Sequence, residues 1–233
     1  RPNKTEINWR YSQYGYGVNS APTGRMDGRN TTAFGAANDH PGSMNNNVIA
    51  TAQSYTSPFS ISMAREWNPF CSAVNLTITV TASANFTSVG NLIFRTVMVE
   101  RLIQFSVQPG TNGETEFEDV AIRSFPTLQG GTPLASSWTT GQSTTFTLSC
   151  EVPSYTRKKE EIAFVGFIQD DGNRRVAQAA RVGVDVVPAE ALSTLGGKVD
   201  ITCTGMITPE VTFKNSGTSP ITSATPRKTH SLW

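Results

Sequence analysis

The sequence predicts a mainly β chain whose centre is an antiparallel β-sandwich of jelly-roll or immunoglobulin-like (Ig-like) type, with one short inserted helix. Charged residues make up only 16% of the 233 residues, well below the roughly 25% of typical soluble domains. Apolar residues alternate with Thr, Ser and Asn in several segments, which indicates half-buried strands. Clusters of Gly, Pro, Asn and Asp separate these segments, as expected for strands joined by short turns.

Residues 1–57 are polar, rich in Gly and Asn, and without sustained periodicity. Only Asn45 to Ser54 has the pattern of a short helix. A segment this long without regular structure is not expected to be an independent domain. We therefore interpret it as a linker or as part of a larger unit.

The first strands of the sandwich are expected after residue 72. Every second side chain is apolar in residues 73–82, and residues 92–100 form a further apolar run. The turn residues between these two segments predict that they form a hairpin. Residues 114–124 are predicted to be the inserted helix, because Phe117, Val120 and Ala121 recur at helical spacing behind acidic residues.

The remaining strands follow from the same signals. Residues 144–152 alternate, and the most apolar run, residues 162–169, is joined by a tight turn to residues 174–187 in a central hairpin. A connector then leads to a new β unit within residues 198–224. The predicted core consists of Val74, Leu76, Ile78, Val80, Leu92, Phe94, Phe146, Leu148, Phe164, Phe167, Ile168, Val182 and Val184.

Three cysteines, Cys71, Cys150 and Cys203, make an odd number with no metal-binding or Cys-x-x-Cys spacing. The simplest interpretation is one disulfide and one free thiol. Cys71 and Cys150 are the favoured pair, because the ends of their strands meet if those strands are antiparallel neighbours or face each other across the sandwich. Cys203 is then the free thiol. A second interpretation, with all three cysteines reduced and buried, stays open.

Composition and motifs argue against several classes of function. Lys and Arg number 19 against 18 Asp and Glu, so no field that gathers nucleic acid is expected. No apolar run is long enough for direct membrane insertion. The only histidines, His40 and His230, lie in polar contexts, and no Gly-x-Ser-x-Gly elbow occurs. We therefore expect that the chain is not an enzyme and has no catalytic residues.

Two acidic clusters are weak candidates for binding calcium. Asp170 and Asp171 have the spacing of a tight turn, which is the favoured interpretation. Glu114, Glu116 and Asp119 are better explained as the solvated first turn of a helix. No cofactor is therefore expected. The tryptophans Trp9, Trp67, Trp138 and Trp233 suit a sugar-stacking platform or, preferably, core and interface positions.

The chain resembles exported Bacteroidetes proteins that are thioredoxin-like and related to the outer-membrane protein (Omp) of twenty-eight kilodaltons. Four segments between Ser20 and Ala224 carry the resemblance. Residues 20–27 resemble the loop at the thioredoxin cis-proline, which implies that Pro22 is cis. Residues 109–126 resemble an insertion between sandwich strands, residues 162–179 the closing hairpin, and residues 209–224 the first strands of an Ig-like repeat.

This resemblance implies a domain layout. Residues 1–57 would be a thioredoxin-like remnant and linker, 58–188 the β-sandwich, 189–197 a linker and 198–233 an incomplete Ig-like module. The family's early Cys-x-x-Cys is absent, so an oxidoreductase activity is not carried over. The Ig-like pattern also stops after Ala224.

The leading hypothesis is a non-catalytic structural or adhesive module, secreted and held at the cell surface or outer membrane. Its partner would be a protein, either further copies of the chain or a neighbouring surface subunit, joined by strand addition into oligomers or filaments. One alternative is an accessory substrate-binding domain of a secreted thiol-disulfide oxidoreductase. Another is a carbohydrate-binding module that uses the aromatic side chains.

Overall fold

The computed structural model describes residues 3–14, 16–18, 20–127, 129–183, 187–189, 191–199 and 209–223. The predicted core residue Val184, the predicted free thiol Cys203, His230 and Trp233 lie outside these residues. Within the described part, no helix is long and apolar enough to cross a membrane.

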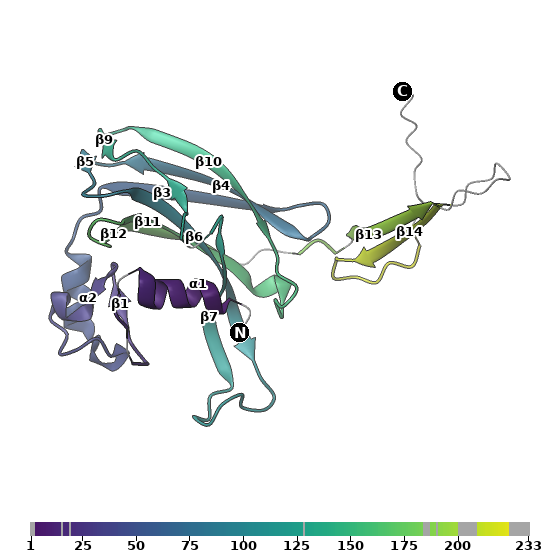
Figure 1. Ribbon diagram of the computed structural model, residues 1–233, viewed down its shortest axis with the longest axis horizontal. Helices are drawn as coiled ribbons and strands as arrows, with labels where there is room; N and C mark the ends of the chain where they lie inside the picture. The colour runs from purple at the N-terminus through teal and green to yellow at the C-terminus, as the bar shows by residue number, and fades with distance from the viewer. Residues whose placement is uncertain are drawn as a thin grey trace.

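Two antiparallel sheets form the body of the molecule (Figure 1). The three-stranded sheet has the order β10–β4–β3, built from β3 (Phe59–Trp67), β4 (Ala73–Ala82) and β10 (Ser143–Glu151). The five-stranded sheet has the order β12–β11–β6–β7, with β8 also paired to β6. Its strands are β6 (Leu92–Gln104), β7 (Glu116–Phe125), β8 (Thr132–Pro133), β11 (Ile162–Asp170) and β12 (Val176–Val182). The predicted mainly β, antiparallel class is confirmed.

The hydrophobic core lies between the two sheets. Alternate residues of β4 are fully buried there, and Phe94 of β6 makes an edge-to-face contact with Phe146 of β10 across the layers. Of the predicted core, the buried members are Val74, Leu76, Ile78, Val80, Leu92, Phe94, Phe164 and Ile168, while Phe146, Leu148 and Val182 are half-buried and pack against them. Phe167 is the exception. It lies on the opposite face of β11 from Phe164 and Ile168, because successive side chains of a strand alternate.

The outward face of the three-stranded sheet consists mainly of short hydroxyl side chains. Thr79 pairs with Thr145 and Thr81 with Ser143, and their hydroxyl oxygens are 2.9 and 3.0 Å apart. These cross-strand hydrogen bonds join β4 to β10 on the side away from the core. The residues on this face are Ser60, Ser62, Ala64, Glu66, Ala73, Asn75, Thr77, Thr79, Thr81, Ser143, Thr145, Thr147, Ser149 and Glu151.

One predicted helix is confirmed and one is wrong. Helix α2 spans Asn46–Gln53, and the Asn45 side chain caps it by accepting from the backbone N–H groups of Asn47 and Val48. Residues 114–124, predicted as a helix, instead contain strand β7. The register against β6 shifts between Met98 and Val99, because Ile122 has no opposite residue. The residues behind the helix prediction all precede this bulge. Phe117 and Val120 are both half-buried although they are three positions apart, and Asp119 between them has a positive φ of 46°, so the strand departs from strict period-two alternation there.

The hairpins also differ in part from expectation. The predicted pairing of residues 73–82 with 92–100 is wrong, because β4 and β6 belong to different sheets. The chain crosses between the layers through β5 (Phe86–Thr87), which pairs with β9 (Ser137–Trp138). The central hairpin of β11 and β12 is confirmed.

The part of the chain before β3, called the N-terminal segment below, packs on the five-stranded sheet (Figure 1). It contains α1 (Lys4–Asn8), a π-helical turn (Trp9–Gln13), and the hairpin β1 (Arg25–Met26) with β2 (Arg29–Asn30). Single turns of 3₁₀-helix follow at Thr31–Phe34 and Pro41–Ser43, and another precedes β11 at Lys159–Glu161. The Ala21–Pro22 peptide bond is cis, as is Phe125–Pro126.

A second hairpin, β13 (Leu192–Val199) with β14 (Pro209–Asn215), projects from the body (Figure 1). Its base is held to the sandwich by Lys159, whose ammonium donates to the carbonyls of Cys71 and Ser216 at 2.7 and 3.2 Å. Ala191, just before β13, is part of the main core. The hairpin is therefore anchored at one end only, within the described residues.

Candidate functional site

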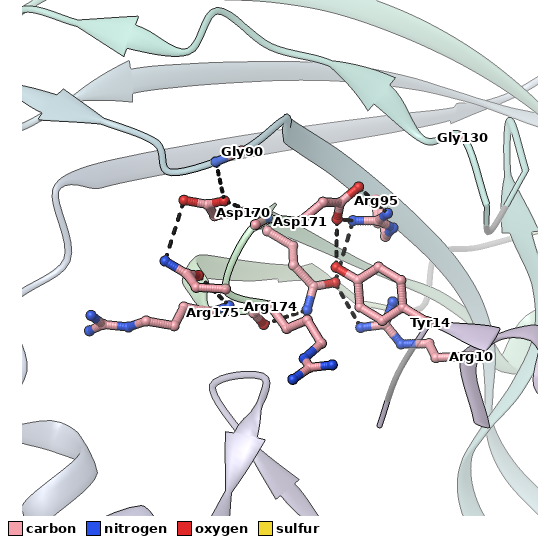
Figure 2. Close-up of polar contacts among 12 residues, drawn as sticks. Arg10, Tyr14, Gly90, Arg95, Gly130, Asp170, Asp171, Arg174 and Arg175 are labelled. Carbon is pink, nitrogen blue, oxygen red and sulfur yellow. Dashed lines mark hydrogen bonds and ion pairs between the residues drawn. The ribbon is translucent and has the colours of Figure 1, made fainter. Parts of the chain in front are cut away.

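A buried polar cluster lies where β6 and β11 meet the N-terminal segment (Figure 2). At its centre Arg95 of β6 forms a bidentate ion pair with Asp171. Nη1 and Nη2 of Arg95 lie 2.8 and 3.1 Å from the two carboxylate oxygens. The Arg95 side chain is only 1% exposed. The Tyr14 hydroxyl donates to the same carboxylate, and the Tyr14 ring lies 5.0 Å from the Arg95 guanidinium carbon. Arg95 is thus paired with both a charge and an aromatic face.

Arg10 extends this cluster from the N-terminal segment. Its Nη2 donates to the Gln169 side chain at 2.9 Å and to the Tyr16 hydroxyl at 3.2 Å. The guanidinium carbon also lies within 5.1 to 5.3 Å of the rings of Tyr14, Phe167 and Tyr16. Residues about 160 positions apart in sequence therefore hold the N-terminal segment on the sheet.

Burial shifts the titration of this cluster. It lowers the pKa of Arg10, because the cation loses hydration. Burial also raises the pKa of Tyr14, and its hydrogen bond to Asp171 raises that pKa further. Arg10 Nη1 is buried and has no hydrogen-bond partner within the described residues. Within the described residues, the Asp171 carboxylate therefore accepts hydrogen bonds from both Tyr14 and Arg95, whereas Nη1 of Arg10 has no acceptor.

A cavity of about 670 Å³ opens beside the cluster, between the N-terminal segment and the outer face of the five-stranded sheet. Its wall is mainly apolar on the sheet side, where it includes Val97, Phe167 and Val176. Arg10 and Tyr16 line the opposite side. A concave apolar pocket with a few polar groups is the usual form of a small-molecule site.

The predicted calcium candidate Asp170 is engaged by the backbone. Its carboxylate accepts from the N–H groups of Val89, Gly90 and Gly172 at 2.6, 2.9 and 2.9 Å, as Figure 2 shows for Gly90. Asp170 is 3% exposed. It therefore joins the turn after β11 to the loop before β6, which agrees with the turn interpretation.

The other acidic candidates are dispersed. Asp171 belongs to the Arg95 cluster, and Asp119 pairs with Arg181. Glu114 accepts from the Asn112 amide and Glu116 from the Gln104 amide. Within the described residues, no three His, Cys, Asp or Glu side chains are grouped so that they could hold a metal ion.

The predicted Cys71–Cys150 disulfide is wrong, because both cysteines are free and buried. The strand arrangement behind the prediction is correct: β4 and β10 are antiparallel neighbours. However, Cys150 lies opposite Val74, three residues after Cys71. Cys71 sits in a turn with a left-handed backbone (φ 48°). Both thiols pack in the core as small apolar groups.

The histidine and tryptophan candidates occupy structural positions. His40 accepts from the Gly42 N–H at 3.0 Å and caps a 3₁₀ turn. Trp67 and Trp138 are buried in the core, and Trp9 packs on Tyr14. These three tryptophans do not form one exposed platform.

Sequence reasoning missed Arg10, Arg95 and Gln169. A signal existed for Arg95, because it interrupts the apolar run 92–99, and a charge within such a run indicates a paired, buried ion. Nothing comparable marks Arg10.

Comparison with known proteins finds a likeness of fold. No protein-family model matches the sequence, and no curated protein matches it. HBP35 of Porphyromonas gingivalis is similar with a TM-score of 0.55 at 13% identity, over 94% of this chain and 76% of that chain. A domain of the outer membrane lipoprotein Omp28 from Porphyromonas gingivalis has a TM-score of 0.36 at 12% identity, over 55% of this chain and 97% of that chain. The likeness to HBP35 shows that the fold is shared.

Proposed function

We propose that this chain is a non-catalytic module of the bacterial cell surface or outer membrane that associates with further copies of itself through the β13–β14 hairpin. The observation that carries the proposal is the pairing of this hairpin. Within the described residues, β13 and β14 pair only with each other. Among these residues, each strand therefore has an edge whose backbone N–H and C=O groups are not paired with a further strand.

The side chains of β14 favour association. Val211 and Phe213 lie on one face of the strand, and each is 45% exposed. An isolated two-stranded hairpin is at best marginally stable in water, so covering this apolar face stabilises it. The net charge of the chain is only +1, so copies do not strongly repel one another.

A second copy of the same hairpin is the occupant we propose. Addition of β14 to β14 about a two-fold axis would present the same surface from both copies. The low charge and the many hydroxyl groups are those of extracellular β proteins, which supports a location outside the cytoplasm. The likeness of fold to HBP35 is compatible with this role.

Light scattering after size-exclusion chromatography, over a wide range of protein concentration, tests the proposal. We expect the mass to rise from one copy to two or more as concentration increases. The double variant Val211→Lys with Phe213→Lys should stay monomeric, because charged side chains on an edge strand oppose strand addition. Val107→Lys is the matched control, since Val107 is 75% exposed in the loop after β6. A wild-type chain that is monomeric throughout would overturn the proposal.

A further inference from the structure

The cavity between the N-terminal segment and the five-stranded sheet has the size of a small-molecule site. Its volume of about 670 Å³ falls within the range of roughly 300–1,000 Å³ that ligand pockets occupy. Val97, Phe167 and Val176 give it an apolar wall. This wall accounts for the apolar part of a ligand and does not by itself select a charge.

Arginine side chains give the cavity chemical selectivity. Arg10, Arg25 and Arg123 line it. Arg10 and Arg25 each have one buried N–H without an acceptor in the described part of the chain, Nη1 of Arg10 and Nε of Arg25. Both lie beside the Tyr16 ring, with guanidinium carbons 5.3 and 5.9 Å from its centroid. A buried donor left without a partner costs about 1–3 kcal/mol, which an added acceptor would recover.

The nearby carboxylates are largely committed elsewhere. Asp171 is held by Arg95 and Tyr14, and Asp39 accepts from Nη1 of Arg25 and from the Thr31 N–H. Glu6 lines the cavity but accepts from the Ser124 N–H at 3.0 Å. Asp27 also lines it. None of these carboxylates accepts a hydrogen bond from Nη1 of Arg10.

We propose that this cavity binds a small amphiphilic monocarboxylate. Its carboxylate accepts from Nη1 of Arg10, with Nε of Arg25 as a second donor, and its apolar chain lies along Val97, Phe167 and Val176. Hydrogen bonds between a guanidinium and a carboxylate are charge-assisted and strong. The site is separate from the β13–β14 hairpin, so this proposal does not rest on self-association.

Titration calorimetry with three compounds of equal chain length tests both halves of the proposal. Decanoate should bind saturably with one site per chain. Decanol has the same chain but no charge, and it should bind about tenfold more weakly or worse, because tenfold corresponds to 1.4 kcal/mol of lost interaction. Decyltrimethylammonium carries the opposite charge and should not bind. Equal affinity for decanoate and decanol, or no saturable binding of decanoate, would overturn the proposal.

Variants locate the site within the chain. Ala121→Trp fills the cavity from β7 without changing a charge, so it should abolish decanoate binding. Ala84→Trp, in an exposed turn away from the cavity, should bind as the wild type does. Arg10→Met keeps the apolar stem and should reduce the preference for decanoate over decanol. Near-ultraviolet circular dichroism checks that each variant is folded. Wild-type binding by Ala121→Trp would also overturn the proposal.

Discussion

Arg95 and Asp171 form an ion pair in which the cation is almost fully buried and the anion is only partly so. Nη1 and Nη2 of Arg95 lie 2.8 and 3.1 Å from the two carboxylate oxygens, and the side chains are 1% and 28% exposed. The pair links β6 to the end of β11, directly under the N-terminal segment. Loss of the Asp171 carboxylate would therefore leave a buried cation without its partner, whereas loss of the Arg95 guanidinium would leave a carboxylate that water partly reaches.

Removal of Asp171 alone is expected to destabilise the fold strongly. Asp171→Ala leaves the buried Arg95 without its carboxylate, which we expect to lower the free energy of unfolding by about 3 kcal/mol. The double variant Arg95→Met with Asp171→Ala should lose less, because no uncompensated charge remains buried. Urea denaturation measures both values. A double variant less stable than the single one would contradict this account.

The free thiols predict a dependence of stability on pH. Burial raises the pKa of Cys150 to about 12 from 9.0. The unfolded thiol therefore loses its proton first, and the free energy of unfolding should fall as pH rises above about 9, by up to about 1.4 kcal/mol per unit. Cys150→Val should reduce this slope when urea denaturation is repeated at roughly pH 9 to pH 11, because the folded and unfolded thiols differ in protonation between their two pKa values.

Thiol counting checks the same cysteines independently. In denatured, unreduced Cys203→Ser, two reactive thiols per chain are expected, since Cys71 and Cys150 are both free. In the folded protein they should react very slowly, because burial keeps them protonated. If no thiol reacted after denaturation, Cys71 and Cys150 would be joined by a disulfide after all.

Gly166 of β11 is expected to tolerate no side chain. A Cβ built there would lie 2.6 Å from Cζ of Phe94 and 2.8 Å from Sδ of Met63, so it would force the two sheets apart. We expect Gly166→Val to cost about 1–3 kcal/mol or more through overpacking. Gly183→Ala is the control, because nothing lies within 4 Å of a Cβ there. Thermal melting of both variants would show the contrast, and equal melting temperatures would argue against it.

Asp170 is expected to stabilise the fold without calcium. Asp170→Ala removes the acceptor of three backbone N–H groups, and we expect a loss of about 2–3 kcal/mol. Chelation of divalent ions should leave the melting temperature of the wild type unchanged. A rise on adding calcium that disappears in Asp170→Ala would instead indicate a metal site.

The sequence predicted what depends on local alternation and missed what depends on distant partners. Strands β4 and β10 were predicted because their burial follows a strict period of two. Strand β7 was assigned as a helix because its half-buried residues Phe117 and Val120 are three positions apart, which departs from that period. Strand β3 was missed although Phe59, Ile61, Met63 and Trp67 alternate. Alternation also does not specify which strands pair, so β4 and β6 were joined wrongly.

The polar cluster was beyond sequence reasoning for the same physical reason. Arg10 meets Gln169 across 159 positions, and no pattern near Arg10 indicates that a cation will be buried there. Gln169 lies on the face of β11 opposite the core, where alternation alone predicts exposure, yet it is fully buried. Docking of the N-terminal segment reverses that prediction.

The hydroxyl face of the β10–β4–β3 sheet affects how the molecule responds to electrolyte. Glu66 and Glu151 are the only charged side chains among the residues named for that face. Added salt screens forces between charges, with a Debye length of about 8 Å at physiological ionic strength, but it does not screen hydrogen bonds between neutral hydroxyls. Adsorption of this face to a polar surface should therefore persist in brine, where contacts made by ion pairs would be lost.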